Sequence, residues 1–283
     1  MPSSFDLLWA TDVHLDHLPL RHAPFEFGRA LRGEQPKSRG AILSGDIGES
    51  DTLEIILEDF ASGYAGPVYF VLGNHDYYGS SFRVVDQRVA ELCRRNTNVH
   101  WLQRSTVLVS RSVRLIGVNG WYDAGNGDRG TDLEMTDFQR IADLSAAKNE
   151  SRERLLQVCA QRARREARRL QDQLRSCADA RSVLVVTHVP SFQKAAWHEG
   201  ETSNDRWAPF FSSKVVGDVL LKSARARPEL QHTVLCGHTH GRGVYQPLPN
   251  LVVYTGRARY GAPELAGILS IDAAGSGVRV QPI

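Results

Sequence analysis

Short apolar runs alternate with helix-like patterns through the first third of the chain. Residues 7–10, 41–43 and 68–72 are apolar runs of strand length, and small or polar residues follow each of them. Between the second and third runs, residues 52–60 have apolar positions at helical spacing. Strands that alternate with helices predict an α/β fold with parallel strand pairing. In such folds ligands bind just beyond the carboxyl ends of the strands.

The middle of the chain changes character. Residues 106–110 and 113–118 predict a hairpin. Residues 120–150 then contain seven acidic and three basic residues. Residues 151–177 predict one long helix with a single apolar face, and eight arginines occupy the rest of its surface: Arg152, Arg154, Arg162, Arg164, Arg165, Arg168, Arg169 and Arg175. This arginine-rich surface is interpreted either as a solvated helix face or as a contact for nucleic acid or another polyanion.

The last third returns to strands. Residues 183–186 and 233–236 are runs of the buried type, whereas residues 252–254, 267–271 and 278–280 have the pattern of antiparallel strands. The chain has no fixed-period repeat and no linker-like segment. We therefore expect residues 1–283 to form a single domain with two packed sheets and a cap-like or rim insertion around residues 120–178.

Composition narrows the class of protein. The chain has 283 residues, of which 42% are hydrophobic and 23% charged, and this is ordinary for a globular domain able to bury a sizeable core. A net charge of +2 argues against a wholly basic nucleic-acid coat. No apolar run reaches about eighteen residues, which predicts no membrane insertion. The first residues do not read as a signal peptide, and the four cysteines form no C-x-x-C pair, so we expect reduced thiols and a cytoplasmic location.

Side chains that bind metals concentrate in five segments, each directly after a predicted strand. These segments are Asp12-Val13-His14, Gly45-Asp46, Gly73-Asn74-His75-Asp76, Thr187-His188 and Gly237-His238-Thr239-His240. Residues i and i+2 of an extended chain point the same way, so each D-x-H or H-x-H pair can present two ligands to one place. The glycines allow sharp turns and a close approach of the backbone to an ion or a phosphate.

The ligand set contains imidazole, carboxylate and amide groups and no thiolate. This mixture suits Mn²⁺ best, Fe or Zn next, and Mg or Ni less well. Seven ligands are too many for one ion and suit two, with Asp46 placed to bridge them. Two cations about 3.5–4 Å apart stabilise both the attacking and the leaving oxygens of a phosphoryl group and make hydroxide available near neutral pH.

The five segments, in this order, resemble the calcineurin-like metallophosphoesterase superfamily, and the match runs from residue 12 to residue 240. The resemblance implies a four-layer αββα sandwich of two mixed β-sheets flanked by helices. It implies that one ion is held by Asp12, His14, Asp46 and His240, and the other by Asp46, Asn74, His188 and His238. It further implies that His75 contacts the phosphate and protonates the leaving oxygen, with Asp76 orienting it. Asn74, His75 and Asp76 are therefore the expected catalytic residues.

We expect a phosphoesterase that hydrolyses phosphomonoesters or phosphodiesters of small molecules by attack of a metal-bridging hydroxide, with His75 as general acid. A nuclease and a protein serine/threonine phosphatase are the alternatives within this chemistry. A non-catalytic scaffold usually lacks ligands or the acid histidine, and this chain keeps them. A structural zinc site is usually closed and four-coordinate, which seven ligands do not match.

Other residues have weaker signals. Trp121, Arg257 and Tyr260 follow predicted strands, and each is interpreted as a substrate contact or as part of a surface turn. Residues 192–215 form a polar and aromatic insertion after His188. This insertion is expected to be either a lid over the site or a loop anchored by its aromatic residues.

Overall fold

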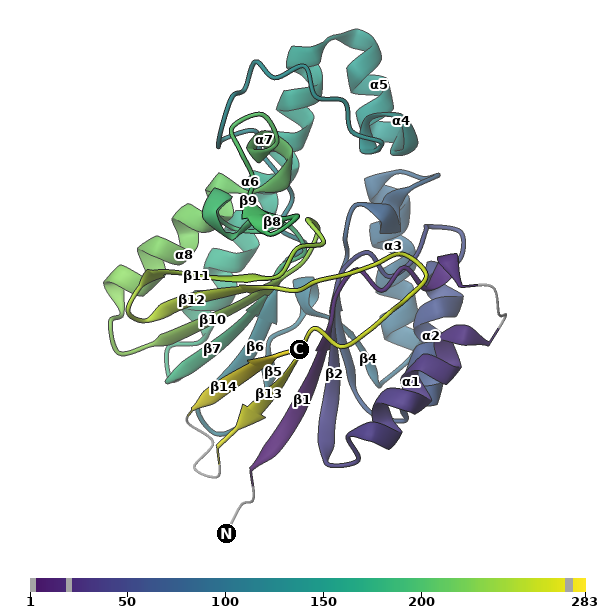
Figure 1. The fold of residues 1–283 in the computed structure, drawn as a ribbon, viewed down its shortest axis with the longest axis vertical. Helices are drawn as coiled ribbons and strands as arrows, with labels where there is room; N and C mark the ends of the chain where they lie inside the picture. The colour runs from purple at the N-terminus through teal and green to yellow at the C-terminus, as the bar shows by residue number, and fades with distance from the viewer. Residues whose placement is uncertain (1–3, 19–21, 273–276) are drawn as a thin grey trace.

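Two six-stranded mixed sheets form the centre of the fold (Figure 1). The structure is a computed structural model, and it describes residues 4–18, 22–272 and 277–283. The first sheet has the order β14-β13-β1-β2-β3-β4. Its strands are β1 (Phe5–Ala10), β2 (Ser38–Ser44), β3 (Val68–Val71), β4 (Val99–Trp101), β13 (Gly267–Ile271) and β14 (Val278–Pro282). Strands β1 to β4 are parallel, and β13 and β14 continue the sheet in antiparallel pairing.

The second sheet has the order β11-β12-β10-β7-β6-β5. Its strands are β5 (Val107–Leu108), β6 (Val113–Gly117), β7 (Ser182–Val186), β10 (Gln231–Cys236), β11 (Gly243–Leu248) and β12 (Leu251–Thr255). Strands β6, β7, β10 and β12 are parallel, and both edge strands are antiparallel to their neighbours. The two sheets face each other through apolar side chains that include Trp9, Val71, Leu115, Leu184 and Leu269.

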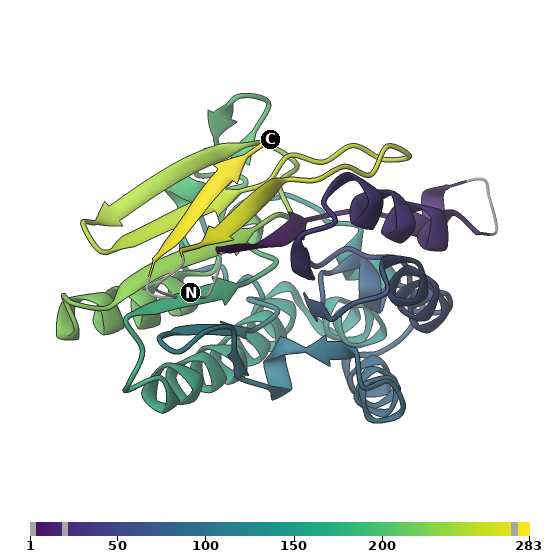
Figure 2. The same ribbon diagram turned by 90° about the horizontal axis from the view of Figure 1, so that it is seen from below.

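Helices cover the outer face of each sheet, as the view from below also shows (Figure 2). The first sheet is covered by α1 (Ala23–Glu34), α2 (Leu53–Tyr64) and α3 (Phe82–Arg95). The second is covered by α6 (Arg152–Ser176) and α8 (Lys214–Ala226). The result is a four-layer sandwich, which confirms the predicted fold class. Among the described residues, no helix is long and apolar enough to cross a membrane.

The remaining elements gather beyond the carboxyl ends of the parallel strands. The short helices α4 (Asp137–Arg140) and α5 (Ala142–Glu150) lie at the top of Figure 1, next to the amino-terminal part of α6. The segment after β7 forms α7 (Ala208–Phe211) and a small hairpin of β8 (Trp197–His198) and β9 (Glu201–Thr202). Both groups therefore lie at the end of the sandwich to which the five ligand segments belong.

Helix α6 contributes to two parts of the core. Leu155 and Cys159 pack in the same cluster as Phe138 and Leu144 of the rim. Leu170 lies one turn further along the helix than the buried Glu166. It packs in the apolar cluster between α6, α8 and the second sheet. The carboxyl-terminal half of α6 therefore belongs to the sandwich, although it falls within the insertion expected around residues 120–178.

Three features of the strands differ from the sequence pattern. Strands β4 and β11 were not predicted, because β4 is only three residues long and β11 contains Gly243 and Pro247. An edge strand tolerates proline, because its outer N–H groups need no partner in the sheet. The segment around residues 252–254 belongs to β12, whose pattern predicted antiparallel pairing. The strand is antiparallel to β11, as predicted, but it is parallel to β10.

Candidate metal centre and active site

The five segments meet because each follows a parallel strand. Asp12, Asp46 and Asn74 come after β1, β2 and β3 of the first sheet, and His188 and His238 come after β7 and β10 of the second. Parallel strands place their carboxyl ends at one edge of a sheet, and the two sheets are stacked face to face. Segments that are far apart in the sequence therefore converge at one end of the sandwich.

The backbone turns sharply at the ligand positions. Asp12, His14, Asp46, His238 and His240 all have φ between 40° and 69°, in the left-handed region. This conformation costs a residue other than glycine about 1–3 kcal/mol and persists where the surroundings impose it. Hydrogen bonds between the turns impose it here: Asp12 N donates to Gly45 O at 3.0 Å and His14 N to Asp46 O at 3.0 Å.

Glycines make room for the ligand side chains. A Cβ on Gly73 would lie 2.1 Å from Asp46 Oδ1, and one on Gly237 would lie 1.9 Å from Asp12 Oδ2. Gly45 has φ of +92°, and a Cβ there would lie 2.5 Å from the His188 ring. These positions require glycine because a side chain would overlap a ligand atom.

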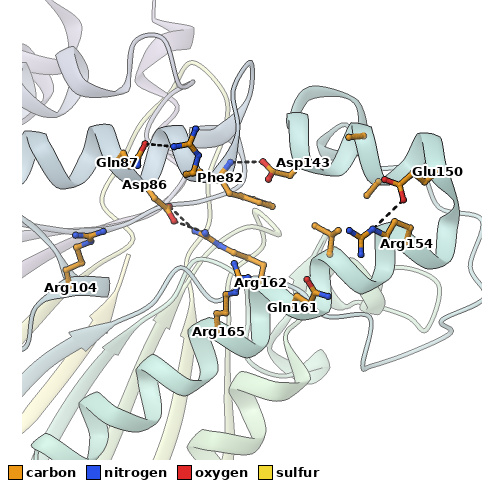
Figure 3. A pocket seen from close by; sticks show the side chains of 14 residues that line it. Phe82, Asp86, Gln87, Arg104, Asp143, Glu150, Arg154, Gln161, Arg162 and Arg165 are labelled. Atoms are coloured by element: carbon orange, nitrogen blue, oxygen red, sulfur yellow. Dashed lines mark hydrogen bonds and ion pairs between the residues drawn. The ribbon is translucent and has the colours of Figure 1, made fainter.

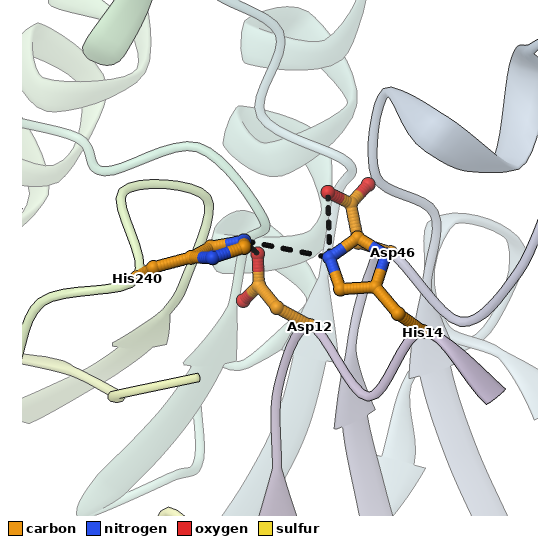
Figure 4. Close-up of side chains that lie close together, drawn as sticks. All are labelled: Asp12, His14, Asp46 and His240. Carbon is orange, nitrogen blue, oxygen red and sulfur yellow. Dashed lines mark hydrogen bonds and ion pairs between the residues drawn. The ribbon is translucent and has the colours of Figure 1, made fainter. Parts of the chain in front are cut away.

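One group of donors consists of Asp12, His14, Asp46 and His240, whose ligand atoms all lie within 4.8 Å of one another (Figure 4). His14 Nε2 lies 3.4 Å from His240 Nε2 and 3.9 Å from Asp46 Oδ2. His240 Nε2 lies 3.4 Å from Asp12 Oδ1. Two imidazole nitrogens and two carboxylates thus face a common point.

A second group surrounds the amide oxygen of Asn74. This Oδ1 lies 3.0 Å from His188 Nε2 and 2.9 Å from His238 Nδ1. His188 Nε2 also lies 3.4 Å from Asp46 Oδ1. The two oxygens of Asp46 therefore face different groups, Oδ2 the first and Oδ1 the second.

Backbone carbonyls select which ring nitrogens of the second group face the site. Nδ1 of His188 donates to Ser44 O at 2.9 Å, and Nε2 of His238 donates to Phe210 O at 2.9 Å. The opposite nitrogen of each ring is thereby presented to Asn74. A hydrogen bond of this kind on the outer nitrogen is the usual way in which proteins orient a metal-binding histidine.

The charges are those of a cation site. Burial lowers the pKa of both His14 and His238 to about 4, so both rings are neutral, as metal ligands must be. Burial disfavours charge on His188 as well, but Asp46 and Asp12 outweigh it and raise the pKa of His188 to about 10. A proton on His188 balances part of the buried carboxylate charge, and a divalent cation would do so at the same place. The nitrogen and oxygen donors fit such ions.

Comparison with known proteins agrees with this site. The sequence profile of calcineurin-like phosphoesterases matches residues 5–242. The chain belongs to the calcineurin-like phosphoesterase family. It is therefore a hydrolase that acts on phosphoric ester bonds, and the similarity inferred from the motifs is confirmed. A search of curated protein sequences finds no match.

Several solved structures share the fold of this phosphoesterase at low identity. A phosphopantetheinyl hydrolase from Mycobacterium tuberculosis has 13% identity and a TM-score of 0.65, with 92% of each chain covered. A dimetal phosphatase from Danio rerio has 14% identity and a TM-score of 0.59, with 95% of this chain and 93% of that chain covered. The anchor protein of the inner membrane complex of Plasmodium has 10% identity and a TM-score of 0.51, with 99% of this chain and 89% of that chain covered. Likeness at this level of identity shows a common fold.

His75 lies at the mouth of the phosphoesterase site. Its ring is 18% exposed, and Nε2 lies 3.9 Å from Asp46 Oδ2 and 3.5 Å from the Tyr260 hydroxyl. The ring packs against Tyr78 and His14 with centroids 4.3 and 4.7 Å away. Nε2 is thus directed toward the donor groups, in a position from which a proton can be delivered.

Asp76 does not orient this ring, which corrects the expectation from the sequence. Its carboxylate accepts hydrogen bonds from Ile47 N at 2.9 Å, Gly48 N at 3.0 Å and Gly73 N at 2.7 Å. His75 Nδ1 is buried without a hydrogen-bond partner. Asp76 is adjacent to His75 in sequence but points to the other side of the turn, where it ties the turns after β2 and β3 together.

The sequence pattern missed Asp137, which is 1% exposed. Its Oδ1 accepts from Asn74 Nδ2 at 2.9 Å and from the Tyr78 hydroxyl at 2.6 Å, and its Oδ2 accepts from the Tyr122 hydroxyl at 2.8 Å. By holding the amide nitrogen, it turns Asn74 Oδ1 toward the two histidines. Asp137 is one of seven acids in residues 120–150, and its type and spacing do not distinguish it from the others.

The insertion after β7 forms a wall of the site. Phe210 O accepts the hydrogen bond from His238, and Thr239 O accepts one from His198 Nδ1 at 3.0 Å. The Phe211 ring packs against the rings of both His198 and His238. The insertion is therefore held against the ligand segment, as expected for an aromatic anchor.

The three residues with weaker signals, Tyr260, Arg257 and Trp121, lie in different surroundings. Tyr260 is half-exposed, and its ring lies over His14, His17 and His240 with centroid distances of 4.3 to 5.1 Å. Arg257 is exposed and paired with Glu264 at 2.9 Å. Trp121 is 1% exposed and packs in the core, so in this conformation it cannot contact a substrate, contrary to its interpretation as a substrate contact.

Proposed function

We propose that this protein hydrolyses phosphomonoesters or phosphodiesters with the help of two divalent metal ions. The observation that carries the proposal is the position of Asp46, whose two oxygens face two separate groups of donors. A carboxylate placed in this way can bind two ions at once. We assign the other donors by the group in which each lies: Asp12, His14, Asp46 and His240 for one ion, and Asp46, Asn74, His188 and His238 for the other.

We infer that Mn²⁺ is the preferred ion, with Fe or Zn next and Mg or Ni less well suited, because nitrogen and carboxylate donors are mixed and thiolates are missing from the set. When bound, two such ions would neutralise phosphoryl oxygens and supply a nucleophilic water near neutral pH.

The residues of the chain itself would bind and protonate the substrate. The His75 Nε2 atom faces the donor groups and would transfer a proton to the leaving oxygen. Asn74 Nδ2 is already bound to Asp137, so Asn74 would act through its oxygen as a ligand. The Tyr260 ring covers His14 and His240 and would contact the part of the substrate nearest to the solvent.

The test is hydrolysis of p-nitrophenyl phosphate and bis(p-nitrophenyl) phosphate by chelator-treated protein with and without added Mn²⁺. The proposal expects turnover of at least one ester, restored by Mn²⁺ and abolished in Asp46→Asn. The matched control is Asp132→Asn, an exposed acid outside both donor groups. The proposal fails if neither these esters nor a wider panel of phosphoesters is hydrolysed with any of the five metals.

A nuclease is the second candidate function, because four neighbouring arginines of α6 are exposed and have no acidic partner, in the described part of the chain, that would neutralise their charge. Among the described residues, Arg164, Arg165, Arg168 and Arg169 are exposed and make no ion pair, whereas Arg154, Arg162 and Arg175 each have an acidic partner. The near-neutral net charge favours small substrates. A nuclease would lose activity steeply with salt and when these four arginines are changed to glutamate. Unchanged hydrolysis of small esters in that variant, with no nuclease activity in either protein, would remove this candidate.

Two further alternatives concern substrate and role. A protein serine/threonine phosphatase would use the same centre, and the surrounding loops would select its substrate. A phosphoserine peptide in the substrate panel tests this alternative. A non-catalytic scaffold is disfavoured because His75 and the complete ligand set are kept.

We also infer that residues 1–283 act as one domain whose rim, around residues 120–178, borders the substrate site. The rim supplies Asp137 and Tyr122 to the surroundings of Asn74. A cytoplasmic location stays a prediction, supported by four cysteines that are all free thiols.

A further inference from the structure

A cleft of about 630 Å³ lies between α3, α5 and α6 (Figure 3). Its walls are formed by these three helices and by the single turn η3 (Leu102–Arg104). The donor groups of the metal centre come from the turns after β1, β2, β3, β7 and β10, so the cleft is a separate feature of the molecule.

The positive charges of the cleft exceed its negative charges. Five arginines and three acids line it: Arg83, Arg104, Arg154, Arg162, Arg165, Asp86, Asp143 and Glu150. The acids are already engaged, since Asp86 pairs with Arg162 at 2.7 Å, Glu150 pairs with Arg154 at 3.6 Å, and Asp143 accepts from Phe82 N at 2.8 Å. Their negative charge is therefore directed at partners within the protein.

Three arginines of the cleft have no acidic partner among the described residues, and one of them, Arg83, donates a hydrogen bond to Gln87 Oε1 at 3.4 Å. Among the residues that the structure describes, neither Arg104 nor Arg165 makes an ion pair. The Arg104 guanidinium is held over the Trp101 ring, 5.5 Å from its centroid. Guanidinium groups without a carboxylate partner are the usual ligands of phosphate-type anions, which they bind through paired N–H donors.

The buried Arg162 side chain is held by hydrogen bonds within the protein. Arg162 is 8% exposed, and besides Asp86 it binds Glu166 at 2.8 Å and the Tyr77 hydroxyl at 2.6 Å. Its hydrogen-bonding capacity is used within the protein, so it shapes the cleft and leaves recognition of a ligand to Arg104 and Arg165. A site whose supporting side chains are already ordered loses less entropy on binding.

Apolar side chains line another part of the cleft, next to the Glu150–Arg154 ion pair. Ala146, Ala147 and Val158 line it one turn away from Glu150 and Arg154 on their helices. Figure 3 shows Arg104 at one end of the cleft, Arg165 beside Arg162 nearer its middle, and the Glu150–Arg154 pair at the opposite end. The cleft therefore combines an apolar patch, which lies beside the Glu150–Arg154 ion pair, with arginines that have no acidic partner among the described residues.

We propose that this cleft binds a small organic anion with a phosphate-type head and a hydrocarbon body. Arg104 and Arg165 bind the dianionic head, and Phe82, Ala147 and Val158 contact the body. A volume of about 630 Å³ lies within the usual range for small-molecule sites. The site is independent of the proposed metal centre, so either proposal can fail without the other.

The test uses the full chain with Mn²⁺ and ¹⁹F NMR of 4-(trifluoromethyl)benzylphosphonate, whose C–P bond a phosphoesterase does not hydrolyse. Asn74→Ala is used throughout to weaken binding at the metal centre. In this background Arg104→Glu/Arg165→Glu should weaken binding by about tenfold or more, since two charge-assisted contacts are reversed. The matched control is Arg164→Glu/Arg168→Glu, which makes the same charge change on the side of α6 that lines a different cavity, against α8. Its affinity should stay unchanged.

Two further ligands and one variant test the two parts of the cleft. Methylphosphonate, which has the head alone and no fluorine, is measured by its displacement of the benzylphosphonate. Methylphosphonate and 4-(trifluoromethyl)benzyl alcohol, which has the body alone, should both bind more weakly. Ala146→Trp, at an exposed position of the apolar patch, should weaken the benzylphosphonate and leave methylphosphonate unchanged. The proposal is overturned if the Arg104/Arg165 variant binds as the parent does, or if both arginine pairs weaken binding equally. Circular dichroism of each variant confirms that it is folded.

Discussion

The carboxylate of Asp137 accepts hydrogen bonds from Asn74, Tyr78 and Tyr122, all of which are buried. Asn74 could otherwise rotate its amide and offer nitrogen in place of oxygen to the site. A residue that binds no ligand itself thus determines which atom of Asn74 faces His188 and His238. Mutation of residues that hold metal ligands in this way typically lowers metal affinity or activity by about 10–100-fold.

Replacing Asp137 should therefore weaken metal binding. Asp137→Ala removes both acceptor oxygens and with them three hydrogen bonds, and it is expected to lower Mn²⁺ affinity by about 10–100-fold. Asp137→Asn should have a smaller effect because one oxygen remains. Isothermal titration with Mn²⁺ measures this directly. Asp132→Ala, an exposed acid of the same segment, is the control and should bind as the parent does. Equal affinity in all four proteins would contradict the role of Asp137.

His75 leads to a second prediction at this scale. A general acid matters when the leaving group is a strong base, and p-nitrophenolate leaves without being protonated. His75→Asn should therefore lower kcat by about 10²–10⁴-fold for an alkyl phosphate and much less for p-nitrophenyl phosphate. Steady-state rates on both substrates test this. An equal loss on both would show that His75 acts by binding or by structure alone.

At the scale of elements, the site is built from the turns that follow parallel strands. Asp76 joins two of these turns through backbone N–H groups of Ile47, Gly48 and Gly73. Asp12 joins two others, since its carboxylate accepts from His238 N at 2.9 Å. The acidic side chains thus hold the turns together as well as facing the candidate ions, and the glycines allow the turns to approach.

This arrangement predicts which glycines are irreplaceable. Gly73→Ala and Gly237→Ala would place a methyl group about 2 Å from a carboxylate oxygen of Asp46 or Asp12. Both variants should lose Mn²⁺ binding and ester hydrolysis, because the oxygen or its turn must move. Gly33→Ala in α1 meets nothing within 4 Å and should bind metal normally. Normal metal binding by Gly73→Ala or Gly237→Ala would show that the turns can adjust.

Helix α6 shows how far an element can be predicted. Its period predicted residues 151–177, and the structure places it at Arg152–Ser176, because a long amphipathic pattern is a strong local signal. Its arginines could not be assigned in the same way. Arg162 is buried with Asp86 and Glu166, Arg165 lines the cleft beside α3, and Arg164 lines the cavity beside α8. These differences depend on which elements pack against each side of the helix.

At the scale of the molecule, neighbouring strands of the first sheet bring two buried carboxylates close together, and histidines that follow strands of the second sheet face them. Asp12 and Asp46 are 1% and 2% exposed. Burial raises the pKa of each carboxyl, and the Asp46 charge raises the pKa of Asp12 further, but His188 and other histidines outweigh these effects and lower the pKa of both. Charges of the same sign at this depth destabilise the folded state unless a cation balances them. A bound ion should therefore stabilise the whole fold.

Thermal unfolding tests this expectation. A ligand that binds only the native state adds about 2.7 kcal/mol when its free concentration is 100 times its Kd. Adding Mn²⁺ to chelator-treated protein should therefore raise Tm, and the rise should be much smaller in Asp46→Asn. Mg²⁺ at equal concentration should raise Tm less than Mn²⁺ does. A Tm unchanged by any of the metals would argue against a metal centre.

The sequence by itself determined the order of the five segments that carry candidate ligands, their positions after strands and the chemical type of each candidate ligand. These features are local, because strand ends, turns and ligand types are encoded by a few neighbouring residues. Only the tertiary structure decided which atoms meet. His14 and His240, for example, are 226 positions apart, and the turns that contain them follow strands of different sheets. It selected Asp137 among seven acids, directed Asp76 away from His75 and buried Trp121. Each of these outcomes depends on how the two sheets and the rim pack together. That packing involves residues far apart in the sequence, so a local sequence pattern cannot predict it.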